Sequence, residues 1–342
     1  MIKSLTSLRG IFILFIFLHH CSLYSGGGSM AVAFFFVLGG FCMTLGYREK
    51  IQVSDFSYKR FILKRAIKFY PLHWMCLIAT LPTLLIHPLA WGKAIGLFGI
   101  NAALLQSWIP VESVYFSYNA VSWYLCDTMF FTIMFPALCR IITSTSKKGK
   151  AAIATAIAGL YAVVVALIPT KMYHPILYIC PLIRLTDFVL GIYLALAFMA
   201  LKEKSKPVRI SSFALQVISI LLIVFLVIES CYLSDNARLI APLYWPLVGA
   251  LILSVSLSDA YGGGRGWLEN KWLFRLGKLS FVIYMVHQVI MRYLTNVFRL
   301  LHYENDIVYF LLAILLTGIV SVVVDRYILR PLSQWLIKRI SA

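Results

Sequence analysis

The sequence predicts an all-α fold, a polytopic transmembrane helical bundle, and three observations carry that prediction. Hydrophobic residues make up 61% of the 342 residues, and the mean hydropathy is +0.87. Several apolar stretches reach about 20 residues, the length at which an α-helix crosses a bilayer. Lysine and arginine gather in alternate loops, which is typical of membrane topology. Continuous apolar runs favour helices over a barrel, the other backbone arrangement that a bilayer admits.

The hydropathy pattern predicts about ten spanning helices and one weaker segment. The expected spans are residues 7–24, 30–47, 70–88, 120–143, 151–169, 176–200, 212–231, 239–257, 279–300 and 307–328. Residues 93–108 are apolar but begin with Lys93 and carry Asn101, Gln106 and Trp108. We expect this segment to be interfacial or re-entrant, because polar side chains are costly in lipid.

Loop charges set the expected orientation. The cations lie in residues 48–69, 144–150, 201–211 and 258–278 and in the C-terminal tail, whereas the intervening loops carry one or none. With ten spans, every basic loop and both the N- and C-termini fall on the cytoplasmic side; a full span at 93–108 would break this alternation. Topology therefore explains the net charge of +18, and we expect membrane lipids rather than nucleic acid as partners.

We expect residues 1–342 to form a single integral membrane domain, because no soluble region or internal repeat is visible. The seven cysteines lie mostly in apolar segments, without CxxC or Cys/His spacing, so we predict neither disulfides nor a metal. Residues 7–24 are expected to be a retained span rather than a cleaved signal peptide, because Arg9 and two histidines interrupt the apolar run.

The first expected span carries a cation and an imidazole on one face. Arg9 and His20 are eleven residues apart, which is three helical turns plus about 20°, with about 16 Å between them along the axis. His19 points about 80° away. Ionisable groups within a membrane usually face a cavity or the bundle interior. The alternative is that Arg9 extends to the headgroups and His20 only hydrogen-bonds a neighbour.

A basic pair stands at the start of the third expected span. Arg65 and Lys68 lie one helical turn apart and face the same way. Such a pair suits phosphate groups, because lysine supplies a point charge and arginine a planar fork. The alternative is a topology signal that contacts anionic lipids.

Two further spans carry acidic residues. Asp127 is a carboxylate inside an apolar run, and its alternative reading is a buried, hydrogen-bonded structural residue. Arg184 and Asp187 stand at positions i and i+3, where they can neutralise one another as a structural pair or face a substrate path.

A polar stripe marks the ninth expected span. Ser280, Tyr284 and His287 fall at positions i, i+4 and i+7, which places them on one helix face. This arrangement indicates either a lined cavity or an interhelical hydrogen-bond seam.

The chain resembles acyltransferase family 3 in the order of these elements, from about residue 5 to residue 338. This is a family of integral membrane O-acyltransferases that includes bacterial O-antigen and exopolysaccharide O-acetyltransferases. Arg9 through His20 is similar to the family's Arg-x10-His signature. Other similar segments are Phe34 to Phe41 (FFVLSGF), Lys64 to Pro71 (RRxxRxxP), Trp123 to Pro136 (WSLSxExxFYxxxP), Gly277 to His287 (LGxxSYxxYLxH) and the dipeptide Arg330-Pro331. Gly39, Lys68 and Phe281 stand where these patterns have Ser, Arg and Tyr.

One departure concerns the acidic position. Thr128 occupies the place of the family's Glu and Thr132 that of its Tyr, while Asp127 lies one residue earlier, about 100° around a helix. Asp127 either replaces the Glu or leaves its function moved or lost. We expect no extra-membrane SGNH domain of the kind that some family members carry.

The resemblance implies transfer of an acyl group, chiefly acetyl, from cytoplasmic acyl-CoA (acetyl-CoA as donor substrate, without a metal) to a hydroxyl of a lipid-linked or surface glycan. This would be O-acetylation in polysaccharide biosynthesis at the bacterial inner membrane. Arg9, Arg65 and Lys68 would hold the donor phosphates and His20 would be the general base, or form a transient acyl-His. Asp127 would orient or charge-stabilise the imidazole.

Four residues are expected along the path of the acceptor or the thioester: Arg184, Ser280, Tyr284 and His287. A proton-coupled transporter or flippase of a small anion or glycolipid is the main alternative, because intramembrane Arg, Asp and His suit transport as well. Against it, no inverted repeat is visible. A purely structural membrane subunit is disfavoured by five polar clusters at family-like spacing.

Overall fold

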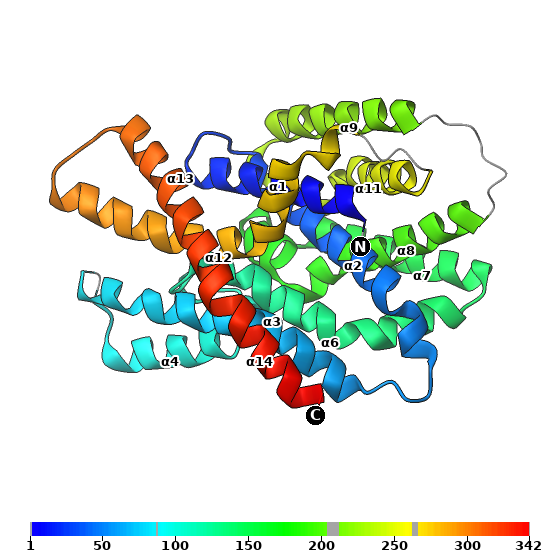
Figure 1. Cartoon of the computed structure of the whole chain (residues 1–342), viewed down its shortest axis with the longest axis horizontal. Helices are drawn as coiled ribbons and strands as arrows, with labels where there is room; N and C mark the ends of the chain where they lie inside the picture. The colour runs from blue at the N-terminus through cyan, green and yellow to red at the C-terminus, as the bar shows by residue number, and fades with distance from the viewer. Residues whose placement is uncertain (1, 87, 204–211, 262–265, 342) are drawn as a thin grey trace. The chain divides into compact units, whose positions relative to one another are not determined.

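The structure, a computed structural model, describes residues 2–86, 88–203, 212–261 and 266–341, and this part of the chain consists of helices and the turns that join them (Figure 1). The chain forms two compact units. The first comprises residues 1–56 and 130–278, and the second comprises residues 57–129 and 279–342. Parts of the basic loops at 201–211 and 258–278 lie outside the described residues.

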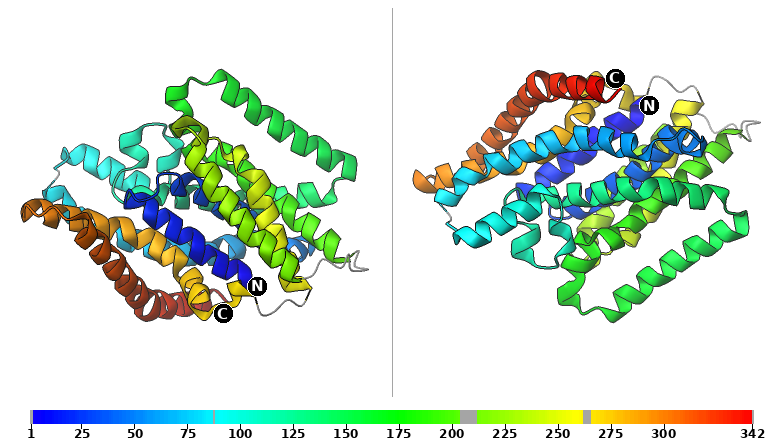
Figure 2. Two further views of the ribbon diagram at one scale, coloured as in Figure 1. Left: turned by 90° about the horizontal axis from the view of Figure 1, so that it is seen from above. Right: turned by 90° about the horizontal axis from the view of Figure 1, so that it is seen from below.

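The first unit is built around two helix pairs. Its helices are α1 (Lys3–His20), α2 (Gly27–Gln52), most of α6 (Trp123–Ser144), α7 (Lys147–Leu167), α8 (Pro181–Glu203), α9 (Ser212–Tyr232), α10 (Asp235–Arg238) and α11 (Trp245–Ala260). Shorter turns are η4 (Thr170–Met172), the π-helical η5 (Tyr173–Ile179), η6 (Ala241–Leu243) and η7 (Trp267–Glu269). Helix α2 packs along α8 and α9 along α11, whereas α7 lies at the rim of this unit (Figure 2).

The second unit carries the basic helix and the C-terminal hairpin. Its helices are α3 (Tyr58–Ala79), α4 (Trp91–Ala102), α5 (Glu112–Tyr115), most of α12 (Lys271–Leu300), α13 (Asp306–Val323) and α14 (Arg330–Ser341). Shorter elements are η1 (Leu81–Leu85), η2 (Gln106–Trp108), η3 (Ala120–Ser122) and the π-helical η8 (Val324–Leu329). Helix α14 packs against α3, and α4 also packs against α3.

Seven of the described helical segments are long and apolar enough to cross a membrane. They are Gly27–Gln52, Ala120–Ser144, Lys147–Leu167, Pro181–Glu203, Phe213–Tyr232, Lys271–Leu300 and Asp306–Ile340. Helix α11 is a shorter apolar helix, and α4, within the predicted interfacial segment, has 12 residues. The chain is therefore a multi-pass membrane protein; the predicted total of ten spans and the cytoplasmic placement of both termini stay predictions.

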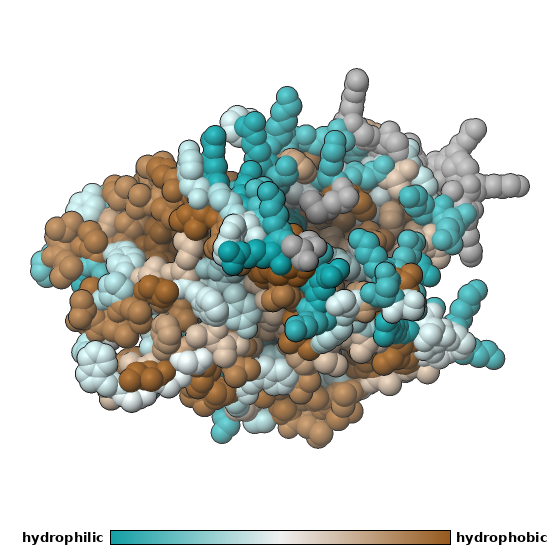
Figure 3. All heavy atoms as spheres, turned by 60° about the horizontal axis from the view of Figure 1, so that its bottom comes forward, coloured by the Kyte–Doolittle hydropathy of each residue, from teal (hydrophilic) through white to brown (hydrophobic). Residues whose placement is uncertain are grey.

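Apolar side chains cover broad areas of the face drawn in Figure 3. Leu85, Trp91 and Leu167 are 88%, 84% and 77% exposed. Isolated apolar side chains on a soluble surface need no explanation, but broad apolar areas mark contact with lipid or with a partner. This surface agrees with the hydropathy of the sequence.

Helix α3 departs from the expected boundaries. It begins at Tyr58, twelve residues before the span expected at 70–88, and ends at Ala79. Ser57 caps its N-terminus, since the side-chain oxygen accepts a hydrogen bond from the backbone N–H of Arg60 at 3.3 Å. Lysine and arginine favour helices almost as much as alanine does, so the basic stretch continues the helix instead of forming a loop. Hydropathy therefore located the apolar part of the helix and not its beginning.

Two glycines let α2 and α8 meet backbone to backbone. A Cβ atom on Gly40 would lie 2.0 Å from the carbonyl oxygen of Phe188, and one on Gly191 would lie 2.0 Å from that of Val37. Small residues at such crossings are typical of membrane helices, because close packing replaces the hydrophobic force that lipid does not supply. The residue before Gly40 is less confined: a Cβ atom on Gly39 would lie 3.7 Å from the ring of Phe188.

We expect Gly191→Ala to abolish the folded protein or to lower its apparent Tm strongly, because the added methyl group would overlap backbone atoms of α2. Gly46→Ala, in α2 with no atom within 4 Å of its Cβ position, is the control. It should raise stability slightly, since alanine favours a helix by about 1 kcal/mol over glycine. Gly39→Ser should be tolerated. Thermal unfolding in detergent, followed by size-exclusion chromatography, measures all three, and an unchanged Tm for Gly191→Ala would contradict this packing.

Candidate active site

The two residues of the predicted signature lie in one unbroken helix. Arg9 and His20 both belong to α1, which is helical from Lys3 to His20. Both side chains are half-buried, whereas Leu8 and Phe12 on the same helix are fully buried. Because the helix is continuous, the spacing of eleven residues places the guanidinium and the imidazole on one face of α1.

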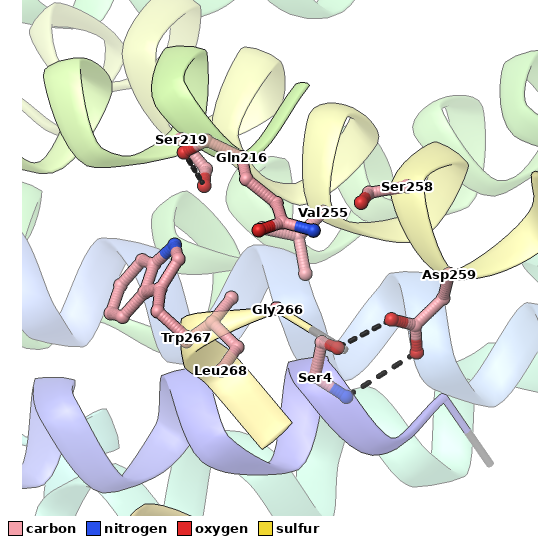
Figure 4. A pocket seen from close by; sticks show the side chains of 9 residues that line it. All are labelled: Ser4, Gln216, Ser219, Val255, Ser258, Asp259, Gly266, Trp267 and Leu268. Carbon is pink, nitrogen blue, oxygen red and sulfur yellow. Dashed lines mark hydrogen bonds between the residues drawn. The ribbon is translucent and has the colours of Figure 1, made fainter. Parts of the chain in front are cut away.

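The N-terminus of α1 is attached to α11. The backbone N–H of Ser4 donates to Oδ2 of Asp259 at 3.4 Å, and the Ser4 hydroxyl donates to Oδ1 of the same carboxylate. A carboxylate is favourable at this end of a helix, because the first N–H groups are unpaired and the dipole is positive there. A small polar pocket adjoins this contact, with Gln216 and Trp267 among its lining residues (Figure 4).

The turn containing Arg9 is fixed against α12. A Cβ atom on Gly277 would lie 1.7 Å from the carbonyl oxygen of Thr6, and one on Gly10 would lie 2.7 Å from that of Leu273. The two helices therefore meet backbone to backbone where both residues are glycine. Both glycines belong to motifs quoted above, and the structure gives them a packing role that the sequence analysis did not assign.

His19 closes the turn that follows α1. Its Nδ1 lies 2.8 Å from the carbonyl oxygen of Ser25, so Nδ1 must be the donor, because a carbonyl can only accept. The ring also packs on Gly28, where a Cβ atom would come within 2.7 Å of it. His19 therefore holds the α1–α2 turn, and the ring of His20 lies 5.1 Å from it, edge to face. Of the two adjacent imidazoles, His20 is the one on the face of Arg9.

Arg184 and Asp187 form the ion pair that their spacing allowed. The Nη2 and Oδ2 atoms are 2.7 Å apart, and both side chains are fully buried. Trp245 donates its indole N–H to Asp187 Oδ1 at 2.5 Å. The guanidinium lies over the rings of Phe36 and Tyr178, with centroid distances of 5.0 and 5.7 Å. The structural pair is thus present, and a role of Arg184 in a substrate path stays a prediction.

In the second unit, α3 carries the predicted phosphate-binding pair. Arg65 is half-buried, and its guanidinium lies 5.8 Å from the ring centroid of Phe61. Lys68 is exposed, and its ammonium lies 5.6 Å from the ring centroid of Phe69. Both residues lie in the same continuous helix, so their side chains leave it in similar directions.

Asp127 is completely buried in α6. Thr128, in the place of the family's Glu, has its hydroxyl bound to the backbone: it donates to the carbonyl oxygen of Tyr124 at 2.9 Å. Such a bond within the helix is common for threonine. The carboxylate of Asp127 is therefore the acidic group that this stretch offers, and its role in the reaction stays a prediction.

The polar stripe of α12 is buried. Ser280, Tyr284 and His287 are 2%, 6% and 1% exposed. Tyr284 donates its hydroxyl to the carbonyl oxygen of Val121 at 3.0 Å. Nδ1 of His287 lies 2.7 Å from the carbonyl oxygen of Tyr284, so this nitrogen carries a proton. At Tyr284 the interhelical seam considered above is present, and the predicted substrate path along these residues stays a prediction.

The predicted residues divide between the two units. Arg9, His20 and Arg184 belong to the first. Those in the second are Arg65, Lys68, Asp127, Ser280, Tyr284 and His287. Within the described residues, no three His, Cys, Asp or Glu side chains gather as a metal site would require.

Sequence reasoning missed a group of buried polar residues in the second unit. His73, Asn101, Gln106 and Asn119 are all at most 2% exposed. A signal was available, because Asn101 and Gln106 stand inside an apolar segment and His73 follows Pro71 in another. Asn101 and Gln106 entered the prediction only as evidence against a full span, and His73 did not enter it.

Comparison with known proteins gives two matches. The model of a family described as an acyltransferase domain matches residues 2–326. An acyltransferase of Streptomyces mycarofaciens, MdmB, is 27% identical over 290 residues, covering 78% of this chain and 69% of that protein. No solved structure matches.

The buried ion pair yields a stability prediction. Asp187→Leu should cost about 3–5 kcal/mol, because it leaves the guanidinium of Arg184 buried without its counter-charge. The double variant Arg184→Met/Asp187→Leu should recover most of this loss, since two apolar side chains leave no buried charge. Apparent Tm values in detergent measure the cycle; equal Tm losses in the single and double variants would show that the pairing itself is unimportant.

Proposed function

The chain belongs to the family defined by this acyltransferase domain and is a membrane acyltransferase, and from this premise we propose that it moves an acetyl group from cytoplasmic acetyl-CoA to a hydroxyl of a surface carbohydrate. The acceptor would be a lipid-linked or surface glycan, such as an O-antigen, lipopolysaccharide or exopolysaccharide. The protein would act in the bacterial inner membrane. The observation that carries the proposal is the face of α1 on which Arg9 and His20 both lie half-buried.

The proposed chemistry needs one base. His20 takes the proton of the acceptor hydroxyl while the oxygen of that hydroxyl attacks the thioester carbonyl. The tetrahedral intermediate then expels the CoA thiolate, and the imidazolium returns the proton to give the CoA thiol and the O-acetyl ester. Histidine suits this task because it titrates near neutral pH and can both accept and donate. In the alternative form of the step, the imidazole itself attacks the thioester and expels the CoA thiolate, which leaves a transient acyl-His. The acceptor hydroxyl then attacks the acyl-His, which releases the free imidazole and the O-acetyl ester, and the hydroxyl proton passes to the CoA thiolate.

The donor would be held by cations. Acyl-CoA is polyanionic, and Arg9, Arg65 and Lys68 supply two planar forks and one point charge for its phosphates. Arg65 and Lys68 point the same way from one continuous helix, as binding a single polyphosphate requires. The proposed roles of Asp127 in catalysis and of Arg184, Ser280, Tyr284 and His287 along the path remain predictions to be tested by substitution.

We expect His20→Ala to lower acetyl transfer by about 10²- to 10⁴-fold, the contribution of a general base, with unchanged protein level. Arg9→Lys should cause a smaller loss, because lysine cannot form two parallel hydrogen bonds to a phosphate. His302→Ala, in an exposed loop, is the control. The readout is mass spectrometry of surface polysaccharide for the acetyl increment, in a strain that lacks the native gene and carries each variant.

An assay of the purified protein separates an acyltransferase of this kind from a transporter. Purified protein given labelled acetyl-CoA and acceptor should release free CoA only if it transfers the group. Wild-type acetylation by His20→Ala would refute the assignment of the base. Label retained on the protein in the absence of acceptor would favour the acyl-His form of the step.

A further inference from the structure

A group of buried polar residues in the second unit has no role in the function proposed above. It consists of His73 on α3, Asn101 on α4, and Gln106 and Asn119 in the chain between α4 and α6, and we call it the amide seam. His73, Asn101 and Gln106 are 0% exposed and Asn119 is 2% exposed. Uncharged polar groups at this depth are costly unless their hydrogen bonds are formed.

The N–H groups of the seam near α3 are paired. His73 Nε2 lies 2.8 Å from the backbone carbonyl oxygen of Asn101. The side-chain amide of Asn101 donates to the carbonyl oxygen of Leu97 at 2.9 Å and to the hydroxyl of Ser117 at 2.7 Å. The carbonyl partners fix the orientations, because a carbonyl cannot donate. Nε2 of His73 therefore carries the proton, and Nδ1 presents a lone pair.

The side-chain nitrogens of Gln106 and Asn119 each have one partner. The amide of Gln106 donates to the hydroxyl of Ser122 at 3.0 Å, and that of Asn119 donates to the carbonyl oxygen of Met285 at 2.9 Å. The chain after Asn119 is also bound to α12, through the hydroxyl of Tyr284 and the carbonyl oxygen of Val121. The seam is thus held between α3, α4 and α12 by its donors.

The acceptors of the seam are not paired. Nδ1 of His73, Oδ1 of Asn101, Oε1 of Gln106 and Oδ1 of Asn119 are buried and have no hydrogen-bond partner among the described residues. Each such atom costs about 1–3 kcal/mol if it stays unmatched. An occupant that brings O–H or N–H groups would satisfy these four acceptors.

The unpaired atoms of the seam are neutral hydrogen-bond acceptors, and this limits which occupant can fit. A phosphate or carboxylate offers only acceptors, so the donor's phosphates do not fit here. An ammonium would donate, but a buried charge without a counter-charge is far more costly than a neutral group. Neutral hydroxyls fit, and they come from two sources, an internal water or a polyhydroxylated ligand.

The backbone of the segment is also strained. Leu104 and Tyr118 have positive φ values of 56° and 55°, a region that side chains other than glycine rarely adopt. The hydroxyl of Tyr118 donates to the carbonyl oxygen of Ala94 at 2.7 Å, which ties this residue to α4. Such conformations persist only where the surroundings impose them, and they cluster at binding and catalytic sites.

We propose that the amide seam is the binding subsite for the hydroxyl groups of the carbohydrate acceptor. This inference rests on the proposed function, because it needs an acceptor with several hydroxyls. It assigns His73 and the three amides to acceptor recognition and leaves donor binding to the cations. The bound sugar would donate its hydroxyl protons to His73 Nδ1 and to the amide oxygens.

The test displaces or removes one acceptor atom of the seam. His73→Gln can still donate from its amide nitrogen to the Asn101 carbonyl but has no lone pair at the position of Nδ1, because its own acceptor oxygen is attached elsewhere in the side chain. The control is His302→Gln on an exposed loop. Gln106→Met, which keeps the length of the side chain, is a second variant should the first fail to fold. The probe is a tritium-labelled fragment of the host surface polysaccharide, de-O-acetylated with mild alkali, and its binding to the full chain is measured in detergent without acyl-CoA.

We expect His73→Gln and Gln106→Met each to weaken binding of the fragment about tenfold, the loss of one buried hydrogen bond, with an unchanged KM for acetyl-CoA. Unchanged binding in the folded variants would show that the seam holds only water and would overturn the inference, as would a wild-type chain that binds no fragment. Binding that depends on His73 without any acetyl transfer would support the seam and refute the proposed function instead.

Discussion

The close approach of α1 and α12 at Gly10 and Gly277 is the constraint on which the predicted signature depends. A side chain at Gly277 would collide with the backbone of Thr6, so the helices can meet only where both lack a Cβ atom. This contact lies beside Arg9, while the Ser4–Asp259 bonds hold the start of α1 and the turn closed by His19 holds its end. These three contacts restrict rotation of α1 about its axis. In lipid, close packing of this kind stabilises helix association, because no hydrophobic force acts between membrane helices.

Polar groups in the two units meet the cost of burial in different ways. In the first unit, Arg184 and Asp187 neutralise one another, and the indole of Trp245 and the aromatic faces add to the pair, while Nε of Arg184 keeps no hydrogen-bond partner among the described residues. In the second, each donor nitrogen of the amide seam has a partner, and one acceptor atom of each residue has none among the described residues. A buried pair of opposite charges is a structural device, whereas uncharged buried acceptors without a donor point to an occupant that donates hydrogen bonds.

Much of the fold and part of the candidate site could be predicted from the sequence. Hydropathy and loop charge predicted the all-helical membrane fold, and the continuous helix from Lys3 to His20 is what the spacing of Arg9 and His20 required. The beginning of α3 was not accessible, because lysine and arginine mark where the apolar segment ends and yet continue a helix. The carbonyl partner of His19 and the indole partner of Asp187 were not accessible either, since folding brings these groups together.

The amide seam also shows why a polar residue in an apolar segment is ambiguous in sequence. Asn101 and Gln106 lower the hydropathy of residues 93–108 whether they face lipid headgroups, water or a ligand. What distinguishes these cases is which of their atoms are bonded, and that is a property of the fold. Carbonyl partners accept hydrogen bonds from the nitrogens of His73, Asn101 and Asn119, so the position of the acceptor atom in each of these side chains follows from geometry. Cations for the donor and neutral acceptor atoms for the sugar would let one membrane domain discriminate its two substrates by charge alone.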